Sequence, residues 1–243
     1  MGRASCRPIQ GPSPVLVGVL LLCGVGCQRS PLGDGLPAKF NCYSCHGSPK
    51  NAAPPLAVNG STSTSYIGVG AHQSHMQEGS ISGPVACEEC HPVPTVMDGD
   101  AHPDPFSGGT VVEFGSLAQT LGASPAWNRT TETCTNTYCH GGPLPGTFVP
   151  APPRWTKVDG SQIKCNSCHA MTAAGLGASH PLHSAYSCDT CHSNVVSADL
   201  KTILDPYLHV DGLVDVIPPS GTWDPVTKTC AGTTAPCHGS NPW

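Results

Sequence analysis

The chain has 243 residues, of which 11% are charged, 5% are aromatic, 15 are cysteine and 12 are histidine, and its formal net charge is −5. Its 28 glycines and 26 prolines exclude long helices and regular sheets, because both residues interrupt such elements. With so few aromatic side chains the polypeptide can build only a thin core, so it is either largely disordered or organised around something other than its own side chains. No basic patch is present, which argues against nucleic acid as a partner.

The first 26 residues are predicted to be an export signal. Arg3 and Arg7 give a positive start, and the apolar run at 15–22 is too short to span a membrane. Small residues then precede Cys27, as in bacterial lipoprotein signals, so Cys27 is predicted to be the acylated first residue of the mature chain. A plain secretory signal cleaved nearby is the alternative. Both predict an exported protein of the periplasm or outer membrane, with a mature net charge of −7 once the two arginines are removed.

The twelve cysteines after Cys27 form six pairs, and a histidine directly follows the second cysteine of every pair. Four pairs have the spacing C-x-x-C-H, whereas the third pair has four intervening residues and the last has six. In chain order the motifs are site 1 (Cys42, Cys45, His46), site 2 (Cys87, Cys90, His91), site 3 (Cys134, Cys139, His140), site 4 (Cys165, Cys168, His169), site 5 (Cys188, Cys191, His192) and site 6 (Cys230, Cys237, His238).

C-x-x-C-H is typical of c-type haem attachment, in which two thiols add to the haem vinyl groups and the histidine binds the iron. A longer loop can bulge outward while the Cys-His end keeps its place, so sites 3 and 6 are predicted to hold haem as well. Zinc sites also use paired cysteines but do not require a histidine after each pair. Redox disulfides are a second alternative, without the βαβ pattern of a thioredoxin-like setting. A disulfide or an unattached site is a further alternative at sites 3 and 6, above all at site 6.

The other six histidines lie in the same order in each half of the chain, as an H-x-x-H pair followed by a single histidine. There are three of them for the three sites of each half, so all six are predicted to be distal iron ligands. The alternative for any one of them is a solvated loop histidine. The predicted distal ligands are His72, His75, His102, His180, His183 and His209.

This recurrence indicates an internal duplication into two tandem trihaem units. The first unit spans 42–141 and the second 165–243, and a Pro/Gly-rich linker joins them at 142–164. Residues 27–41 form an N-terminal linker. Trp127 and Trp223 occupy matching positions, each seven residues before the first cysteine of site 3 or site 6.

Six haems on so short a chain would themselves form its core. The predicted fold is therefore mostly coil with short helices and few short strands, organised around covalently bound haems. A helical turn is expected at each C-x-x-C-H, and brief strands are expected at Thr110–Phe114 and Leu213–Ile217. Without haem the polypeptide is not expected to fold stably, because it cannot bury enough apolar area.

The alternation of CxxCH, HxxH, CxxCH, H-x-D-G-x-V and W…CxxxxCHG resembles the CxxxxCH/CxxCH-domain family of multihaem c-type cytochromes of metal-reducing bacteria. "TCTNTYCHGG" is its most specific piece, and the resemblance covers about 42 to 239. It implies an exported, often lipid-anchored electron carrier. The six-residue gap of site 6 departs from the family, and His102-Pro-Asp-Pro departs from the fuller His209-Val-Asp-Gly of the second unit.

Two histidines on each iron leave no open coordination position and predict low potentials. The predicted function is therefore electron transfer through six c-type haems, without enzymatic activity. The expected partners are redox proteins or an extracellular electron acceptor, with the membrane reached through the lipid anchor. Two alternatives remain. One is a reductase with a single open haem, for which site 6 is the natural candidate. The other is a subunit of a homo-oligomeric cytochrome filament, in which some distal histidines come from a neighbouring copy.

Overall fold

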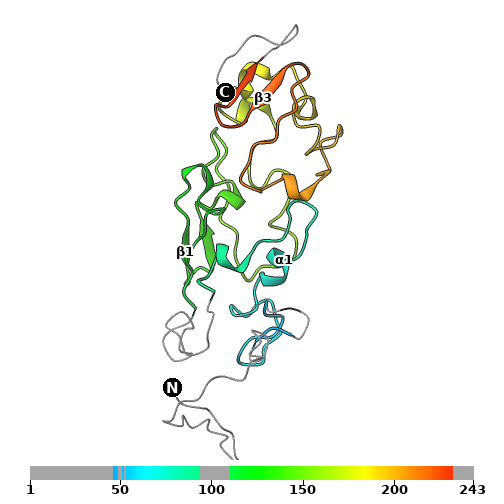
Figure 1. The fold of residues 1–243 in the computed structure, drawn as a ribbon. Helices are drawn as coiled ribbons and strands as arrows, with labels where there is room; N and C mark the ends of the chain where they lie inside the picture. The colour runs from blue at the N-terminus through cyan, green and yellow to red at the C-terminus, as the bar shows by residue number, and fades with distance from the viewer. Residues whose placement is uncertain (1–45, 49–50, 52, 94–109, 232–243) are drawn as a thin grey trace, which may run out of the picture.

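The computed structural model describes residues 46–48, 51, 53–93 and 110–231. Within them the backbone is mostly irregular, with short helices and two small two-stranded sheets, and the described part of the chain is elongated (Figure 1). The predicted irregular backbone with short helices and few short strands is confirmed, whereas its organisation around haems and its two tandem units stay predictions. The predicted signal, the lipidated Cys27 and the linker at 27–41 lie outside the described residues.

The described elements are all three to five residues long. The α-helix is α1 (His72–Met76). The 3-10 helices are η2 (Cys87–Glu89), η3 (Thr120–Gly122), η4 (Tyr138–His140), η5 (Ala173–Gly175), η6 (His180–His183), η7 (Cys188–Thr190) and η8 (Pro206–Leu208). The strands are β1 (Ala126–Asn128), β2 (Thr133–Thr135), β3 (Thr222–Asp224) and β4 (Thr229–Ala231). No helix of the described residues is long and apolar enough to cross a membrane.

The two sheets are matching antiparallel hairpins, β1–β2 and β3–β4. Each places a tryptophan directly opposite the first cysteine of a long-loop motif, Trp127 opposite Cys134 and Trp223 opposite Cys230. The last residue of each first strand, Asn128 or Asp224, accepts backbone N–H groups of the connecting loop through its side chain. Such Asx turns fix the loop, so the recurring Trp-to-Cys spacing has a structural cause.

The two strands expected at Thr110–Phe114 and Leu213–Ile217 are wrong, because both segments have irregular backbone. Their backbone groups pair with C-x-x-C-H turns instead. Glu113 N–H donates to the Cys90 carbonyl at 3.1 Å, and Ile217 N–H donates to the Cys191 carbonyl at 2.7 Å. A segment that pairs with a turn rather than with a second extended segment does not become a strand.

The helical turn expected at each C-x-x-C-H is found at site 2 and site 5, where η2 and η7 begin at the first cysteine. At site 3 the turn η4 includes the second cysteine and its histidine. Site 4 has a turn without helix. The H-x-x-H pairs also differ, since His72 and His75 lie on α1 whereas Pro181 gives the second pair a 3-10 turn, η6.

Very little apolar side chain is buried. Among the described residues the buried hydrophobic ones are Ala53, Ala57, Val69, Ala118, Val195 and Cys230, and none of the larger side chains is fully buried. Large apolar side chains are instead exposed, with Val149, Leu182 and Val226 each more than 80% exposed. Burial on this scale cannot offset the conformational entropy of ordering the chain.

The two predicted units are in contact with each other. Gly83 N–H, after α1, donates to the Pro206 carbonyl of η8 at 2.9 Å, and the Tyr207 hydroxyl donates to Glu78 at 2.9 Å. Figure 1 shows η8, in orange, beside the cyan segment that follows α1. Residues of both halves therefore line the same region, although the division into units itself stays a prediction.

We expect the polypeptide prepared without haem to have no cooperative fold, because its apolar burial is too small. Expression without the first 26 residues would keep the chain away from the export-linked haem-attachment machinery. Amide hydrogen exchange and far-UV circular dichroism should then show near-complete exchange and no sigmoidal melt, in contrast to the haem-loaded protein. A cooperative melt with protected amides in the haem-free chain would contradict this expectation.

Candidate haem-binding sites

The structure describes both cysteines and the histidine of sites 2, 3, 4 and 5. Of site 1 it describes the histidine, and of site 6 the first cysteine. Five of the predicted distal histidines are described as well. The predicted site residues that lie outside the described part of the chain are Cys42, Cys45, His102, Cys237 and His238.

Each described motif histidine of sites 2 to 5 faces one of the predicted distal histidines. At site 2, His91 lies with its ring centroid 6.1 Å from that of His72. At site 3, His140 lies 6.1 Å from His75. The structure thus divides the H-x-x-H pair of α1 between two consecutive sites.

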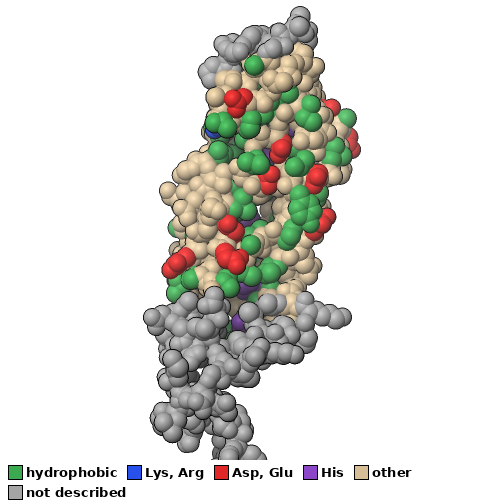
Figure 2. Space-filling view, viewed as in Figure 1, with side chains coloured by type: hydrophobic (Ala, Val, Ile, Leu, Met, Phe, Trp, Pro, Cys, Tyr) green, Lys and Arg blue, Asp and Glu red, His purple; other side chains and the backbone are tan. Residues whose placement is uncertain are grey.

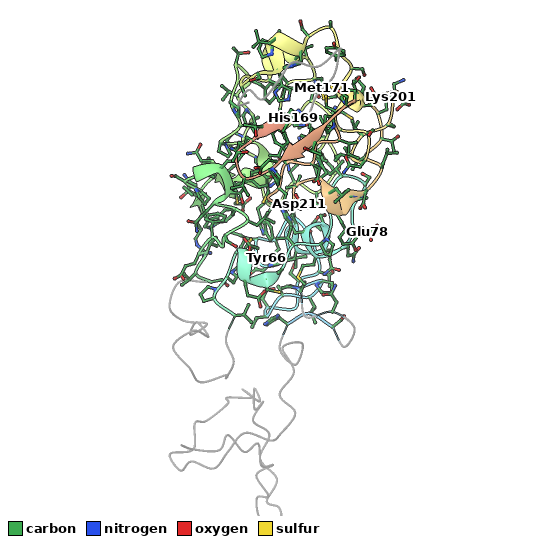
Figure 3. The ribbon with its side chains drawn as sticks, turned by 45° about the horizontal axis from the view of Figure 1, so that its top comes forward. Tyr66, Glu78, His169, Met171, Lys201 and Asp211 are labelled. Carbon is green, nitrogen blue, oxygen red and sulfur yellow. The ribbon has the colours of Figure 1, made fainter. Side chains whose placement is uncertain are left out.

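The second half of the chain contains two further pairs of the same kind. At site 4, the centroid of His169 lies 6.4 Å from that of His209. At site 5, His192 lies 6.5 Å from His180. Figure 3 places His169 among the segments of the C-terminal half.

This spacing fits a metal ion between two imidazoles. Metal–imidazole bonds of about 2 Å, with each ring centre about 1.2 Å beyond its nitrogen, give a centroid separation of about 6.4 Å. Rings in direct contact span about 4.5–7 Å, so what points to a shared metal is that a motif histidine and a predicted distal histidine form the pair at all four sites. The four observed separations all lie between 6.1 and 6.5 Å.

Hydrogen bonds orient most of these rings. Nδ1 of His72, His75, His180 and His209 each lies 2.6 to 3.2 Å from a backbone carbonyl. At sites 2 and 5 the carbonyls of Val111 and Asp215 do the same for the motif histidines. A carbonyl can only accept, so Nδ1 carries the proton and Nε2 keeps its lone pair for a metal. The segments predicted as strands therefore serve to orient these two motif histidines.

Burial keeps two of these imidazoles neutral. It lowers the pKa of His72 to about 4, with a further lowering from the nearby His91. It lowers the pKa of His140 to about 4 as well, with a smaller contribution from His75. The neutral imidazole is the form that binds a metal, so both histidines are in the ligand form over the whole physiological pH range.

The cysteines of site 3, Cys134 and Cys139, are half-buried. This burial raises the pKa of Cys134 and of Cys139 to about 11. A zinc site would need thiolates, which this environment disfavours, whereas a thioether carries no charge. Moreover, in the described residues no three His, Cys, Asp or Glu side chains converge as a metal site. Haem iron needs only two ligands from the protein, because the porphyrin supplies the other four.

No disulfide joins the two cysteines of site 2, 3, 4 or 5. Two hollows lie next to them. One of about 230 Å³ is lined by Cys134, His140 and Pro150, and one of about 220 Å³ is lined by Cys139, Cys168 and His209. Figure 2 shows histidine side chains recessed between the surface groups of the face in view.

Two described histidines of the prediction are outside these pairs. His46 of site 1 has a buried Nδ1 without a hydrogen-bond partner among the described residues, and it is near enough to His72 to lower the pKa of that group slightly. His183 donates from Nδ1 to the Ser179 carbonyl at 2.9 Å and packs against Tyr186. Its ring is therefore oriented in the same way as that of His75.

Sequence reasoning treated 142–164 as a plain linker and missed Trp155 within it. The indole lies 4.7 Å from the His72 ring and 5.6 Å from the His75 ring, and its Nε1–H donates to the Ile67 carbonyl at 2.8 Å. A tryptophan in a Pro/Gly-rich segment of a chain with only four tryptophans is the one sequence signal that could have identified it.

Sites 3 and 4 meet through a glycine. Gly141, directly after His140, has φ +80°, and a Cβ built on it would lie 1.9 Å from the Cys168 carbonyl oxygen. Only glycine allows this approach, which explains why a glycine follows the C-x-x-x-x-C-H motif here. The backbones of two consecutive sites are thus in direct contact.

Residues 133–169 match a family model described as the Geobacter CxxxxCH...CXXCH motif. The match covers sites 3 and 4 and the segment between them, and it confirms the family resemblance found in the sequence. The motifs of this family imply covalently bound c-type haem and indicate a multihaem cytochrome that transfers electrons. Comparison with curated proteins and comparison with solved structures each found no match.

We expect Gly141→Ala to destabilise the haem-loaded protein by about 2–5 kcal/mol, from the positive φ and the overlap with Cys168 together. Gly160→Ala is the matched control, since Gly160 has φ +74° and open space where its Cβ would lie. That control should cost only about 1–2 kcal/mol. Denaturant unfolding of both variants provides the comparison, and equal losses would show that the contact between sites 3 and 4 contributes nothing.

Proposed function

We propose that the protein is an electron carrier whose six c-type haems are each bound by a motif histidine and a distal histidine. One observation carries this proposal, namely the four pairs of motif and distal histidines with centroids 6.1 to 6.5 Å apart. Two protein ligands on the iron leave no position for a substrate, which supports electron transfer over catalysis.

The repeat extends the ligand assignment to the two remaining sites. His209 pairs with His169 of site 4, so its counterpart His102 is assigned to His46 of site 1. His75 pairs with His140 of site 3, so its counterpart His183 is assigned to His238 of site 6. His102 and His238 lie outside the described residues, and these two assignments rest on the sequence repeat.

Contacts between neighbouring sites support a linear order. α1 carries the distal ligands of sites 2 and 3 three residues apart. Cys139 of site 3 is close enough to Cys90 of site 2 and to Cys168 of site 4 for each thiol to raise its pKa. In the second half, η6 carries His180 and His183, the distal ligands assigned to sites 5 and 6. Electron transfer between neighbours requires this kind of proximity.

The bound haems supply one-electron chemistry. The chain supplies the ligands and controls their protonation. Backbone carbonyls accept from Nδ1 and so fix the imidazole tautomer in which Nε2 is free to bind iron, as the Val69 carbonyl does for His72. Burial keeps His72 and His140 neutral. A carbonyl that accepts from Nδ1 also makes the ligand more electron-donating, which favours ferric iron and low potentials.

Export and anchoring are part of the proposal. C-type haem attachment converts the paired thiols to thioethers, which is compatible with export to an oxidising compartment, and the lipoprotein-like signal would tether the chain to a membrane through acylated Cys27. The mature net charge of −7 suits partners or acceptors that carry positive charge, such as basic redox proteins.

The absorption spectrum of the dithionite-reduced protein tests the ligation. We expect six haems per chain, a low-spin spectrum and no change on adding carbon monoxide, because each iron already has two histidines. A carbon monoxide shift that corresponds to one haem would reveal an open iron and would support a reductase instead.

Removing one distal ligand should open one identified site. In His75→Ala, we expect carbon monoxide to bind at one of the six haems, the one at site 3, with all six still attached through cysteine. Gln77→Ala is the control on the same segment, since Gln77 is exposed and its side chain hydrogen-bonds to Gln73 rather than to a histidine. Identical spectra of the two variants would contradict the assignment of His75.

The anchor has a separate test. Cys27→Ser should move the protein from the membrane fraction to the soluble periplasmic fraction, because the acylated residue is lost. Intact mass of the wild-type chain should show the diacylglycerol and acyl additions on a chain that begins at Cys27. A wild-type N-terminus elsewhere, with no lipid mass, would indicate a plain secretory signal.

A further inference from the structure

Trp155 connects the hairpin of site 3 to the helix that carries two distal histidines. Its backbone N–H donates to the Glu132 carbonyl at 2.7 Å, and the preceding residue forms an isolated β-bridge with Thr133. The Arg154 guanidinium forms an ion pair with Glu132 at 3.0 Å, and the Thr156 hydroxyl donates to the same carboxylate. The backbone of Trp155 is thus fixed on the β1–β2 hairpin, whose second strand holds Cys134.

The indole of Trp155 is fixed at its other end by the segment before α1. Nε1–H donates to the Ile67 carbonyl at 2.8 Å, in the region where Figure 3 labels the adjacent Tyr66. Gly70 lies directly against the indole, since a Cβ built on it would fall 1.9 Å from Trp155 Nε1. A side chain at position 70 would displace the tryptophan, so the glycine makes room for it.

The indole contacts both histidines of α1, each with a different geometry. It meets the His72 ring edge-on at 86° and lies at 34° to the His75 ring. Both imidazoles also donate from Nδ1 to a carbonyl of their own turn, Val69 or Ala71. The hydrogen bond fixes which nitrogen points to the metal, but rotation about it remains, and the indole removes that freedom.

The ring planes of the two ligand pairs also differ. His72 and His91 are within 27° of parallel, whereas His75 and His140 are crossed at 75°. In the other half His180 and His192 are within 16° of parallel, and His169 and His209 are crossed at 66°. The angle between two axial imidazoles sets the splitting of the iron d orbitals, and with it the g values of ferric low-spin iron.

We propose that Trp155 is a positioning residue that fixes the ring planes of His72 and His75 and so makes site 2 parallel and site 3 crossed. This inference rests on the proposed function, since it requires both histidines to bind iron. It assigns to the segment between the units a direct role in the electronic properties of two haems. It also predicts two classes of haem signal in one protein.

The experiment is electron paramagnetic resonance of the ferric haem-loaded protein, together with a redox titration. The wild type should give both rhombic low-spin signals from parallel pairs and strongly anisotropic signals from crossed pairs. In Trp155→Leu, the signals of two of the six haems should shift and two potentials should change, with six haems still attached. Trp155→Phe keeps the aromatic contact but loses the bond to Ile67, so it should give a smaller shift of the same two signals.

Two further variants separate the indole from general loosening of the segment. Gly70→Ala leaves Trp155 in the chain but displaces its ring, so it should reproduce the shift of Trp155→Leu. Gln162→Ala removes side-chain bonds to the Arg154 backbone without touching a histidine, and it should leave the spectrum unchanged. If Gln162→Ala gives the same shift as Trp155→Leu, the segment as a whole sets the planes and the role of Trp155 is overturned.

The outcomes also separate this inference from the proposed function. Six low-spin haems with spectra and potentials that do not respond to Trp155→Leu or Gly70→Ala would overturn the role of Trp155 alone. A wild-type protein in which carbon monoxide binds at site 2 or site 3 would show that His72 or His75 is not a ligand, and it would overturn both.

Discussion

The hydrogen bond between a histidine Nδ1 and a backbone carbonyl is the interaction on which the rest of this structure depends. It recurs at eight histidines, and in most of them the carbonyl comes from the same turn or from a neighbouring segment. Each such bond fixes a tautomer and directs Nε2 away from the backbone. Because the chain has few apolar side chains to pack, these bonds, rather than a hydrophobic core, determine how its irregular segments are placed.

The same constraint explains the form of the secondary structure. Extended segments at 111–115 and 214–218 pair with C-x-x-C-H turns and present carbonyls to His91 and His192, so they cannot also form a sheet. The strands that do form are short hairpins that carry the first cysteine of a long-loop motif opposite a tryptophan. Apart from η3 and η5, every regular element described here holds a cysteine or histidine of a site, directly precedes one, or pairs with a strand that holds one, as expected where a cofactor takes the place of a core.

The segment between the two predicted units is more than a connector. It holds Trp155 against the histidines of α1. The residues on either side of it are in contact, since Gly141 precedes the segment and packs against Cys168, which follows it. The family model likewise joins sites 3 and 4 across this segment. His209 donates from Nδ1 to the Ile81 carbonyl at 2.6 Å. A distal histidine of the second half is therefore oriented by the backbone of the first half. Sites 2, 3 and 4 therefore depend on one another for their geometry.

The sequence by itself determined the motifs, the mostly irregular fold and the family resemblance, because cysteine and histidine spacing and Gly/Pro content are local properties. It also identified the candidate ligands, but it left open which histidine serves which site. Only the tertiary structure paired His72 with His91 and His75 with His140, because that choice depends on where a five-residue helix lies between two distant turns. The role of Trp155 and the direction of each ring plane were also decided there. Both follow from contacts between residues far apart in the chain, for which no spacing rule exists.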